Sequence, residues 1–88
     1  MTTPVWEALP NSRTLMLNEG PGGPRLGGWY IAVRPEGPGW HWGVVSAFHR
    51  LIGSGQADTA DLARQVAEAR LPKRLRRRLA VNAESTFR

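Results

Sequence analysis

Cysteine is absent from this sequence of 88 residues, and its absence excludes several kinds of chemistry. Without thiols there is no disulfide, no thiol nucleophile and no zinc site built on thiolates. Long apolar runs are missing as well, since no stretch approaches the roughly 18 residues of a membrane-spanning helix. The first residues lack the basic region and the apolar core of a secretory signal. We therefore expect a protein that works in the cytoplasm.

Clustered catalytic side chains are also missing. The two histidines, His41 and His49, have no carboxylate at the spacing of a metal site, and no serine lies in a nucleophile motif. Acid–base and nucleophilic catalysis need partner groups within hydrogen-bond reach, and the sequence nominates none. We expect half-exposed histidines on strands, no metal or cofactor, and a protein that is not an enzyme.

The small size of the chain predicts one domain of marginal stability. A domain of this length buries only about 60% of the surface that its unfolded chain exposes. The four tryptophans compensate in part, because each can bury roughly 150–250 Å². Self-association is a further source of stability for so small a chain, so a homodimer is among the expected assemblies.

Residues 1–28 are expected to be largely irregular. Pro4 and Pro10 argue against regular structure in the first twelve residues. Residues 20–28 are rich in glycine and proline, which predicts a mobile connecting loop that packs no core. Only residues 13–17 have the apolar character of a strand, which would lie at the edge of a sheet.

Residues 29–71 predict a core domain of three strands and one helix. Apolar and polar residues alternate in residues 29–34 and again in residues 40–47, and a turn sequence rich in glycine and proline separates the two segments. They therefore form a hairpin. A third strand is expected at residues 48–52, after a tight reversal, and a Gly-Ser-Gly run should end it.

The alternation assigns the side chains of the hairpin to two faces. A helix should cover the face formed by Trp29, Ile31, Val33, Trp40, Trp42, Val44 and Ser46. Tyr30, Arg34 and His41 lie on the opposite face, where they are exposed. The alternative interpretation is that the aromatic residues form a platform on which nucleic-acid bases stack. We favour the core interpretation, because so small a domain needs the buried area.

Two helices follow the strands. The first spans residues 58–71, begins at a capping residue, Asp58 or Thr59, and ends before Pro72. Its apolar stripe consists of Leu62, Val66 and Ala69, widened by Ala63 and Ala67. Residues 73–81 predict a short basic helix with a narrow leucine stripe, and residues 82–88 should be a frayed tail.

Positive charge is concentrated at the C-terminal end. Residues 1–69 carry five basic and six acidic residues, a net charge of −1, whereas residues 70–88 carry seven basic and one acidic, a net charge of +6. Such asymmetry indicates an acidic partner. The predicted nucleic-acid-binding residues are Lys73, Arg74, Arg76, Arg77 and Arg78 on the basic segment, with Tyr30, Arg34 and Arg50 on the sheet.

Nucleic acid, and DNA in particular, is the expected partner of the basic segment, because arginine and lysine side chains neutralise phosphates. The sheet residues, with His41, would supply any base specificity. The alternative partner is an acidic protein surface, which would make the chain an inhibitor, adaptor or antitoxin-like module. A membrane is not expected, because the helix has only two leucines and no aromatic anchor.

The expected fold is therefore α+β. A small antiparallel sheet of three strands, or four if residues 13–17 join it, packs on one helix. A short basic helix or tail, residues 72–88, follows the core domain of residues 29–71.

In this layout residues 29–71 resemble the arm-binding domains of tyrosine integrases and the AP2-type domains, and also antitoxins of the HicB type. The matching features are the segment WYIAVRPEG, the strand after it and the Gly-x-Ala-x-Thr lead into the helix at residues 55–59. The resemblance implies a three-stranded sheet packed on one helix and a role in DNA binding. The chain departs from the integrase pattern because its sheet carries only Arg34 and Arg50 as basic residues.

Overall fold

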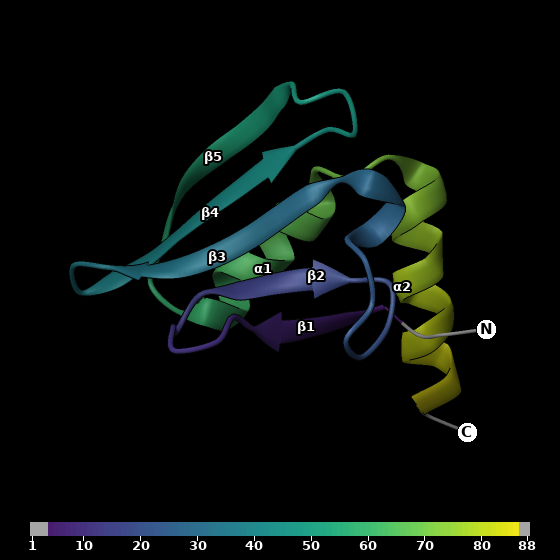
Figure 1. The fold of residues 1–88 in the computed structure, drawn as a ribbon, viewed down its shortest axis with the longest axis horizontal. Coiled ribbons are helices and arrows are strands. Elements are labelled where there is room, and N and C mark those ends of the chain that lie inside the picture. Colours follow the sequence, from purple (N-terminus) through teal and green to yellow (C-terminus); the bar gives the residue numbers. More distant parts are fainter. Residues whose placement is uncertain (1–3, 87–88) are drawn as a thin grey trace.

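The computed structural model describes the backbone of residues 4–86 and the side chains of residues 4–79. Five strands and two helices, with one turn of 3-10 helix, make up an α+β fold (Figure 1). In chain order they are β1 (Val5–Ala8), β2 (Leu15–Asn18), the 3-10 turn (Leu26–Gly28), β3 (Tyr30–Glu36), β4 (Gly39–Val45), β5 (Leu51–Ala57), α1 (Ala60–Ala69) and α2 (Lys73–Thr86).

The strands form one antiparallel sheet in the order β1-β2-β3-β4-β5. Each strand is followed along the chain by its neighbour in the sheet, as expected where short connections join antiparallel strands. Helix α1 crosses one face of the sheet, and α2 stands at the end of the sheet where β3 begins (Figure 1). Neither of these two helices is long and apolar enough, over the residues described, to cross a membrane.

The predicted hairpin is present, and its covered face is the core. Ile31, Val33 and Val44 are fully buried and Trp42 is 6% exposed. They pair across β3 and β4, with Ile31 opposite Val44 and Val33 opposite Trp42. The core interpretation is therefore confirmed for Trp42. The remaining tryptophans, Trp6, Trp29 and Trp40, are partly buried and pack against this cluster.

Strand β1 corrects the prediction that the first residues are irregular. Pro4 precedes the strand and Pro10 follows it. Neither proline therefore interrupts the four residues of β1, which pair with β2. Proline is tolerated at such edge positions because no ladder hydrogen bond is lost there. The Trp6 indole N–H donates to the Glu68 carboxylate at 2.9 Å and ties β1 to α1. The predicted strand at residues 13–17 exists as β2, but it is the second strand and not the edge.

The glycine-rich segment, residues 20–28, also differs from its prediction as a loop outside the core. Leu26 is fully buried in the core cluster. Gly27 and Gly28 adopt φ values of +56° and +81°, a left-handed conformation that glycine adopts without a steric penalty. This reversal leads the chain from Leu26 into β3, and a Cβ on Gly27 would lie 3.3 Å from Leu75 of α2.

Strand β5 begins later and runs further than predicted. Instead of ending at the Gly-Ser-Gly run, it includes that run and reaches Ala57. The reason is the indole ring of Trp42, which lies against the inner face of the strand. A Cβ on Gly55 would meet the indole nitrogen at 3.1 Å, and one on Gly53 would meet the ring at 3.3 Å. Phe48, which was expected to open the strand, lies in the preceding turn and is 90% exposed.

Helix α1 is capped as predicted, but it presents a different face to the sheet. The Thr59 hydroxyl accepts the backbone N–H of Leu62 at 3.1 Å. Ala63 and Ala67 are fully buried, whereas Leu62 and Val66 are 46% and 37% exposed. The predicted Leu62–Val66 stripe was therefore wrong. Small side chains let the helix approach the bulky sheet residues closely, and the larger residues are displaced to its flank.

Helix α2 extends to Thr86, beyond the predicted end at residue 81, so the expected frayed tail is helical as far as that residue. Leu71 before the helix and Leu75 in its first turn are 3% and 5% exposed and belong to the core cluster. Leu79 is partly buried against the same cluster. The basic segment is therefore packed onto the domain.

Candidate nucleic-acid interface

The packing of α2 decides where its charges point. Successive residues of an α-helix are rotated by about 100°, so Leu75 and Leu79 share the side that contacts the core. Arg77 then lies on the opposite side, with Lys73 and Arg74 to either side of it. All three basic residues are exposed. The two leucines thus hold the helix so that a basic face is turned to solvent.

Arg78 has a different environment from these three residues. Its Nη1 atom lies 3.4 Å from Oε1 of Glu19 in the loop after β2. The same carboxylate oxygen accepts the backbone N–H of Gly27 at 3.1 Å. Arg78 therefore fixes α2 to the loop, and part of its charge is already neutralised.

Arg76 lines a shallow groove between the two helices. The groove has a volume of about 320 Å³, and its lining residues are Gln65, Glu68, Ala69, Arg76 and Leu79. The acidic Glu68 on the opposite wall reduces the positive potential around Arg76. The structure thus separates an outer group, Lys73, Arg74 and Arg77, from the other two predicted binding residues of α2. Arg76 is exposed but lines the groove, and Arg78 is paired with Glu19.

The outer group has no acidic partner among the side chains that the structure describes. Carboxylates there form ion pairs with Arg34, Arg64 and Arg78 and contact the His41 ring, and none pairs with Lys73, Arg74 or Arg77. Arg70 adds a further exposed positive charge just before the helix, with its guanidinium 5.7 Å from the centre of the Trp42 ring. Together these residues form a cluster of exposed positive charge around the start of α2, whereas the exposed Arg13, Arg25 and Arg50 lie elsewhere in the fold.

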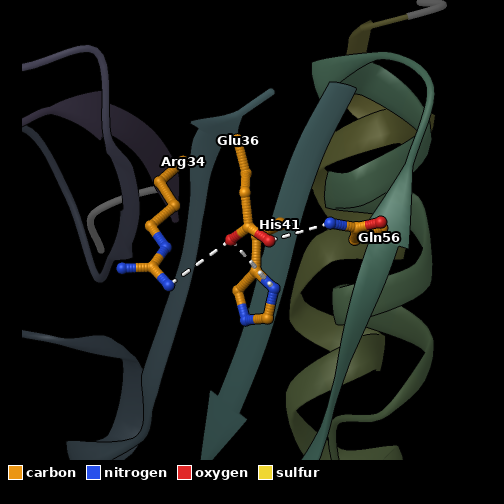
Figure 2. A network of polar contacts seen from close by, with 4 residues as sticks. All are labelled: Arg34, Glu36, His41 and Gln56. Carbon is orange, nitrogen blue, oxygen red and sulfur yellow. Dashed lines mark hydrogen bonds and ion pairs between the residues drawn. The ribbon is translucent and has the colours of Figure 1, made fainter. Parts of the chain in front are cut away.

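The open face of the sheet carries charges that are compensated. Arg34 and His41 are opposite each other on β3 and β4, and Gln56 of β5 is opposite His41. Glu36 lies between them (Figure 2). Its Oε2 is 3.5 Å from Arg34 Nη2 and 3.6 Å from His41 Nδ1, and its Oε1 accepts the Gln56 amide at 2.8 Å. One carboxylate thus offsets the basic groups at this end of the face.

Tyr30 lies at the other end of the open face, and sequence reasoning missed its neighbour. The guanidinium of Arg25 stands 4.6 Å from the centre of the Tyr30 ring, a geometry in which a cation is attracted to the ring. Arg25 comes from the glycine-rich loop, which has no periodicity that would have revealed the contact. Tyr30, Arg34 and His41 still share one shallow groove of about 200 Å³, together with Thr14, Ala32 and Gly43.

Arg50 lies in the turn between β4 and β5 and is exposed. Its backbone N–H donates to the Ser46 hydroxyl at 3.2 Å, and its carbonyl accepts the Ser46 N–H at 2.8 Å. Tyr30 pairs with Val45, and Val45 pairs with Leu51. The structure thus brings Arg50 to the Tyr30 end of the sheet and away from Arg34.

The two histidines are not equivalent. His41 is half-buried on β4, as predicted for both. His49, in contrast, lies in the turn after β4 with a φ of +63° and is exposed, so its predicted place on a strand was wrong. Among the side chains of residues 4–79, no three histidine, aspartate or glutamate residues gather closely enough to hold a metal ion.

No family model matches this chain, and comparison with curated proteins and with solved structures finds no significant match. The resemblance to integrase arm-binding, AP2-type and HicB-type domains therefore stays a prediction from layout. The sheet has five strands, where that layout implies three.

Proposed function

We propose that this chain is a non-enzymatic nucleic-acid-binding protein and that the exposed basic face of α2 is its phosphate-binding element. The observation that carries the proposal is the orientation of α2. Leu75 is seated in the core, so Lys73, Arg74 and Arg77 project to solvent without a described acidic partner.

The closely spaced negative phosphates of nucleic acid complement the positive charges of this face. Each phosphate contacted by an arginine or lysine releases condensed counterions, which favours binding at low salt. The helix is already packed before binding, so little conformational entropy is lost on association. Phosphate contacts position a protein on nucleic acid without reading its sequence. This face therefore contributes affinity but no sequence specificity.

The sheet contributes less to phosphate binding in this proposal. Glu36 offsets Arg34 and His41, which leaves Tyr30 with Arg25 as the aromatic and cationic pair of the open face. That pair directly adjoins the 3-10 turn against which Leu75 packs. Any recognition of bases is therefore assigned to Tyr30 and its surroundings. Tyr30 is the first residue of β3, and α2 stands at the end of the sheet where β3 begins (Figure 1).

Salt dependence tests the assignment to α2. If Arg74 and Arg77 each contact one phosphate, the double variant Arg74→Gln/Arg77→Gln should reduce the slope of log affinity against log salt by about 1.8 on duplex DNA, because each contact is worth roughly 0.9. The loss should be nearly uniform across DNA sequences. Fluorescence anisotropy with labelled mixed-sequence duplexes over a salt series measures both quantities.

The matched control is Arg13→Gln/Arg64→Gln, which removes the same charge from positions outside α2. It should change the slope much less. An equal change would show that bulk charge, and not the face of α2, governs binding. Absence of binding by the wild-type protein to mixed-sequence DNA and RNA at about 50 mM salt, where such contacts are strong, would reject the proposal. An acidic protein partner would then be sought by comparing pull-downs with the wild-type chain and the α2 double variant.

A further inference from the structure

The two edges of the sheet differ in how well they are protected. Strand β1 has only four residues, follows Pro4 and carries the charged Glu7. Short length, proline and charge are the features by which proteins prevent an edge strand from pairing with another chain. Strand β5 has seven residues with the sequence LIGSGQA. It contains no proline and no charge. A bulge at Ile52, where Val44 pairs with Gly53 and Val45 with Leu51, interrupts only the start of the strand, and residues 53–57 keep a regular register with β4.

The outer side of β5 also has free backbone groups. Strand β5 pairs with β4 alone, and it forms the open margin of the sheet (Figure 1). Among the described residues, no turn, loop or side-chain hydrogen bond reaches its backbone from the other side. An edge of this kind presents a row of unpaired N–H and C=O groups that can template a further strand.

An apolar row on α1 lies on the same side of the molecule as this edge. Leu62 and Val66 are the apolar residues of this row and lie one turn apart. Arg70, four residues after Val66, continues the row at the end of the helix. The Arg70 end of the row lies beside Gly53 of β5 and over Trp42. Glu68, on the other flank, binds Trp6 of β1. The exposed Leu62 and Val66 therefore flank β5 and the space next to it.

We propose that β5 pairs antiparallel with the β5 strand of a second copy of this chain, which joins the two sheets into one. The inference is independent of nucleic-acid binding. The strand is complementary to itself, because two identical uncharged strands do not repel each other. With the twofold axis near Ser54, in the middle of the strand, Gly53 of each copy faces Gly55 of the other.

The second copy would also cover the exposed apolar residues on the flank of α1. In a continuous sheet the two Leu62–Val66 rows face each other across the twofold axis. They then shield the inner face of the joined strands and lose exposed apolar area, which favours association. An unrelated extended peptide would satisfy the backbone of β5, but it would bring no helix to cover Leu62 and Val66. The occupant that fits both features is another copy of the chain.

Sedimentation equilibrium of the wild-type protein tests the dimer directly. We expect a monomer–dimer equilibrium within the range of concentrations up to about 1 mM, which covers weak associations. A protein that stays monomeric throughout this range would overturn the proposal. So would a monomer that binds extended peptides at β5 but never a second copy.

Two substitutions locate the interface. Ser54→Lys places two like charges near the axis, and Val66→Glu places a charge on the α1 flank. Each change occurs twice in a symmetric dimer and should weaken dimerisation by at least about tenfold, since like charges on facing strands repel. Leu9→Glu is the matched control, because Leu9 is 38% exposed and Val66 37%, while Leu9 lies in the hairpin loop beside β1. It should leave the dimer intact.

A complementation experiment keeps the test decisive if one variant is poorly folded. Ser54→Lys and Ser54→Glu should each be largely monomeric, whereas a mixture of the two should form a heterodimer, because the charges near the axis are then opposite. Melting temperatures of each variant report folding. A dimer that withstands both Ser54→Lys and Val66→Glu, or that Leu9→Glu disrupts equally, has its interface elsewhere, and the proposal would be wrong.

Discussion

The two faces of the sheet are formed by the same strands and differ in almost every physical property. On β3, Ile31 and Val33 are fully buried beneath α1, while the residues between and after them, Ala32 and Arg34, face the open side. The covered face is apolar and close-packed. The open face carries polar side chains, and at one end of it Glu36 contacts both Arg34 and His41. Neighbouring residues of one strand thus point to opposite faces of the sheet, one into the core and the next toward the surface.

This contrast shows that the residues that contribute most to stability and the residues that carry exposed charge lie in different places. The covered face holds the aromatic and aliphatic side chains that stabilise the fold. The open face has basic groups, but one carboxylate offsets Arg34 and His41. Among the described residues, the exposed positive charge is most clustered on α2, whose leucines belong to the covered side. A helix that looks like a basic tail in the sequence therefore contributes to the core, and its outer side is the phosphate-binding face that we propose.

The largest effect is expected at Trp42, the bulkiest residue of the covered face. Trp42→Ala should lower the free energy of unfolding by about 3–5 kcal/mol, as large-to-small changes in a core do. Tyr30→Ala, on the open face of the neighbouring strand, should cost clearly less, because Tyr30 is only half-buried. Chemical denaturation followed by circular dichroism measures both. Similar losses for the two variants would break the distinction between the faces.

Leu75 tests whether the covered side extends to α2. Leu75→Ala should destabilise the protein by about 2–5 kcal/mol, because Leu75 is 5% exposed and lies against Gly27. Arg77→Ala on the opposite side of the helix should change stability little, since its side chain is exposed. A Leu75 variant that melts near the wild-type temperature would show that α2 can detach without loss to the core.

Two glycines at paired strands give a sharper comparison of the faces. A Cβ on Gly55 would lie 3.1–3.2 Å from the Trp42 indole, whereas a Cβ on Gly43 would have no atom within 4 Å. Gly55→Ala should therefore destabilise the fold by about 1–3 kcal/mol through overpacking. Gly43→Ala should be neutral or stabilising by up to about 1 kcal/mol, because it restricts the unfolded chain. Equal melting temperatures for both variants would contradict this assignment.

The smallest effect concerns Glu7, which lies on the open side of β1. Hydrogen bonds from the Asn18 amide and the Gly22 backbone hold the pKa of the Glu7 carboxyl below its ordinary value of 4.5. A lowered pKa in the folded state adds stability above the ordinary value, and this stability is lost as the pH falls through the lowered one. Glu7→Gln should therefore melt below wild type at neutral pH, and the difference should shrink on acidification below 4.5. A difference that is the same at all pH values would exclude this linkage.

Local patterns in the sequence were sufficient for several elements. The hairpin of β3 and β4 followed from alternation, and its inner face from the position of Trp42. The cap at Thr59 followed from residue type. The excess of positive charge after residue 69 is a property of composition alone. Each of these features depends on residues within a few positions of one another, which is why a single sequence shows them.

Contacts between distant residues decided the rest. Strand β1 depends on pairing with β2 and on the Trp6–Glu68 hydrogen bond, which spans 62 positions. The length of β5 depends on an indole ring from β4, and no periodicity within Gly-Ser-Gly could reveal that. For α1 the sequence predicted an apolar stripe, but only the bulk of the sheet determined that alanines face inward and Leu62 and Val66 face outward.

The candidate binding surface divides in the same way. Composition and helical periodicity are enough to show which residues are basic and that they crowd one helix. Which of their charges are available depends on how the helix packs. Arg78 is paired with Glu19 across 59 positions, and Arg34 with His41 shares the Glu36 carboxylate through strand register. A charge can be counted along a chain, but its neutralisation depends on distance in space, and folding sets that distance.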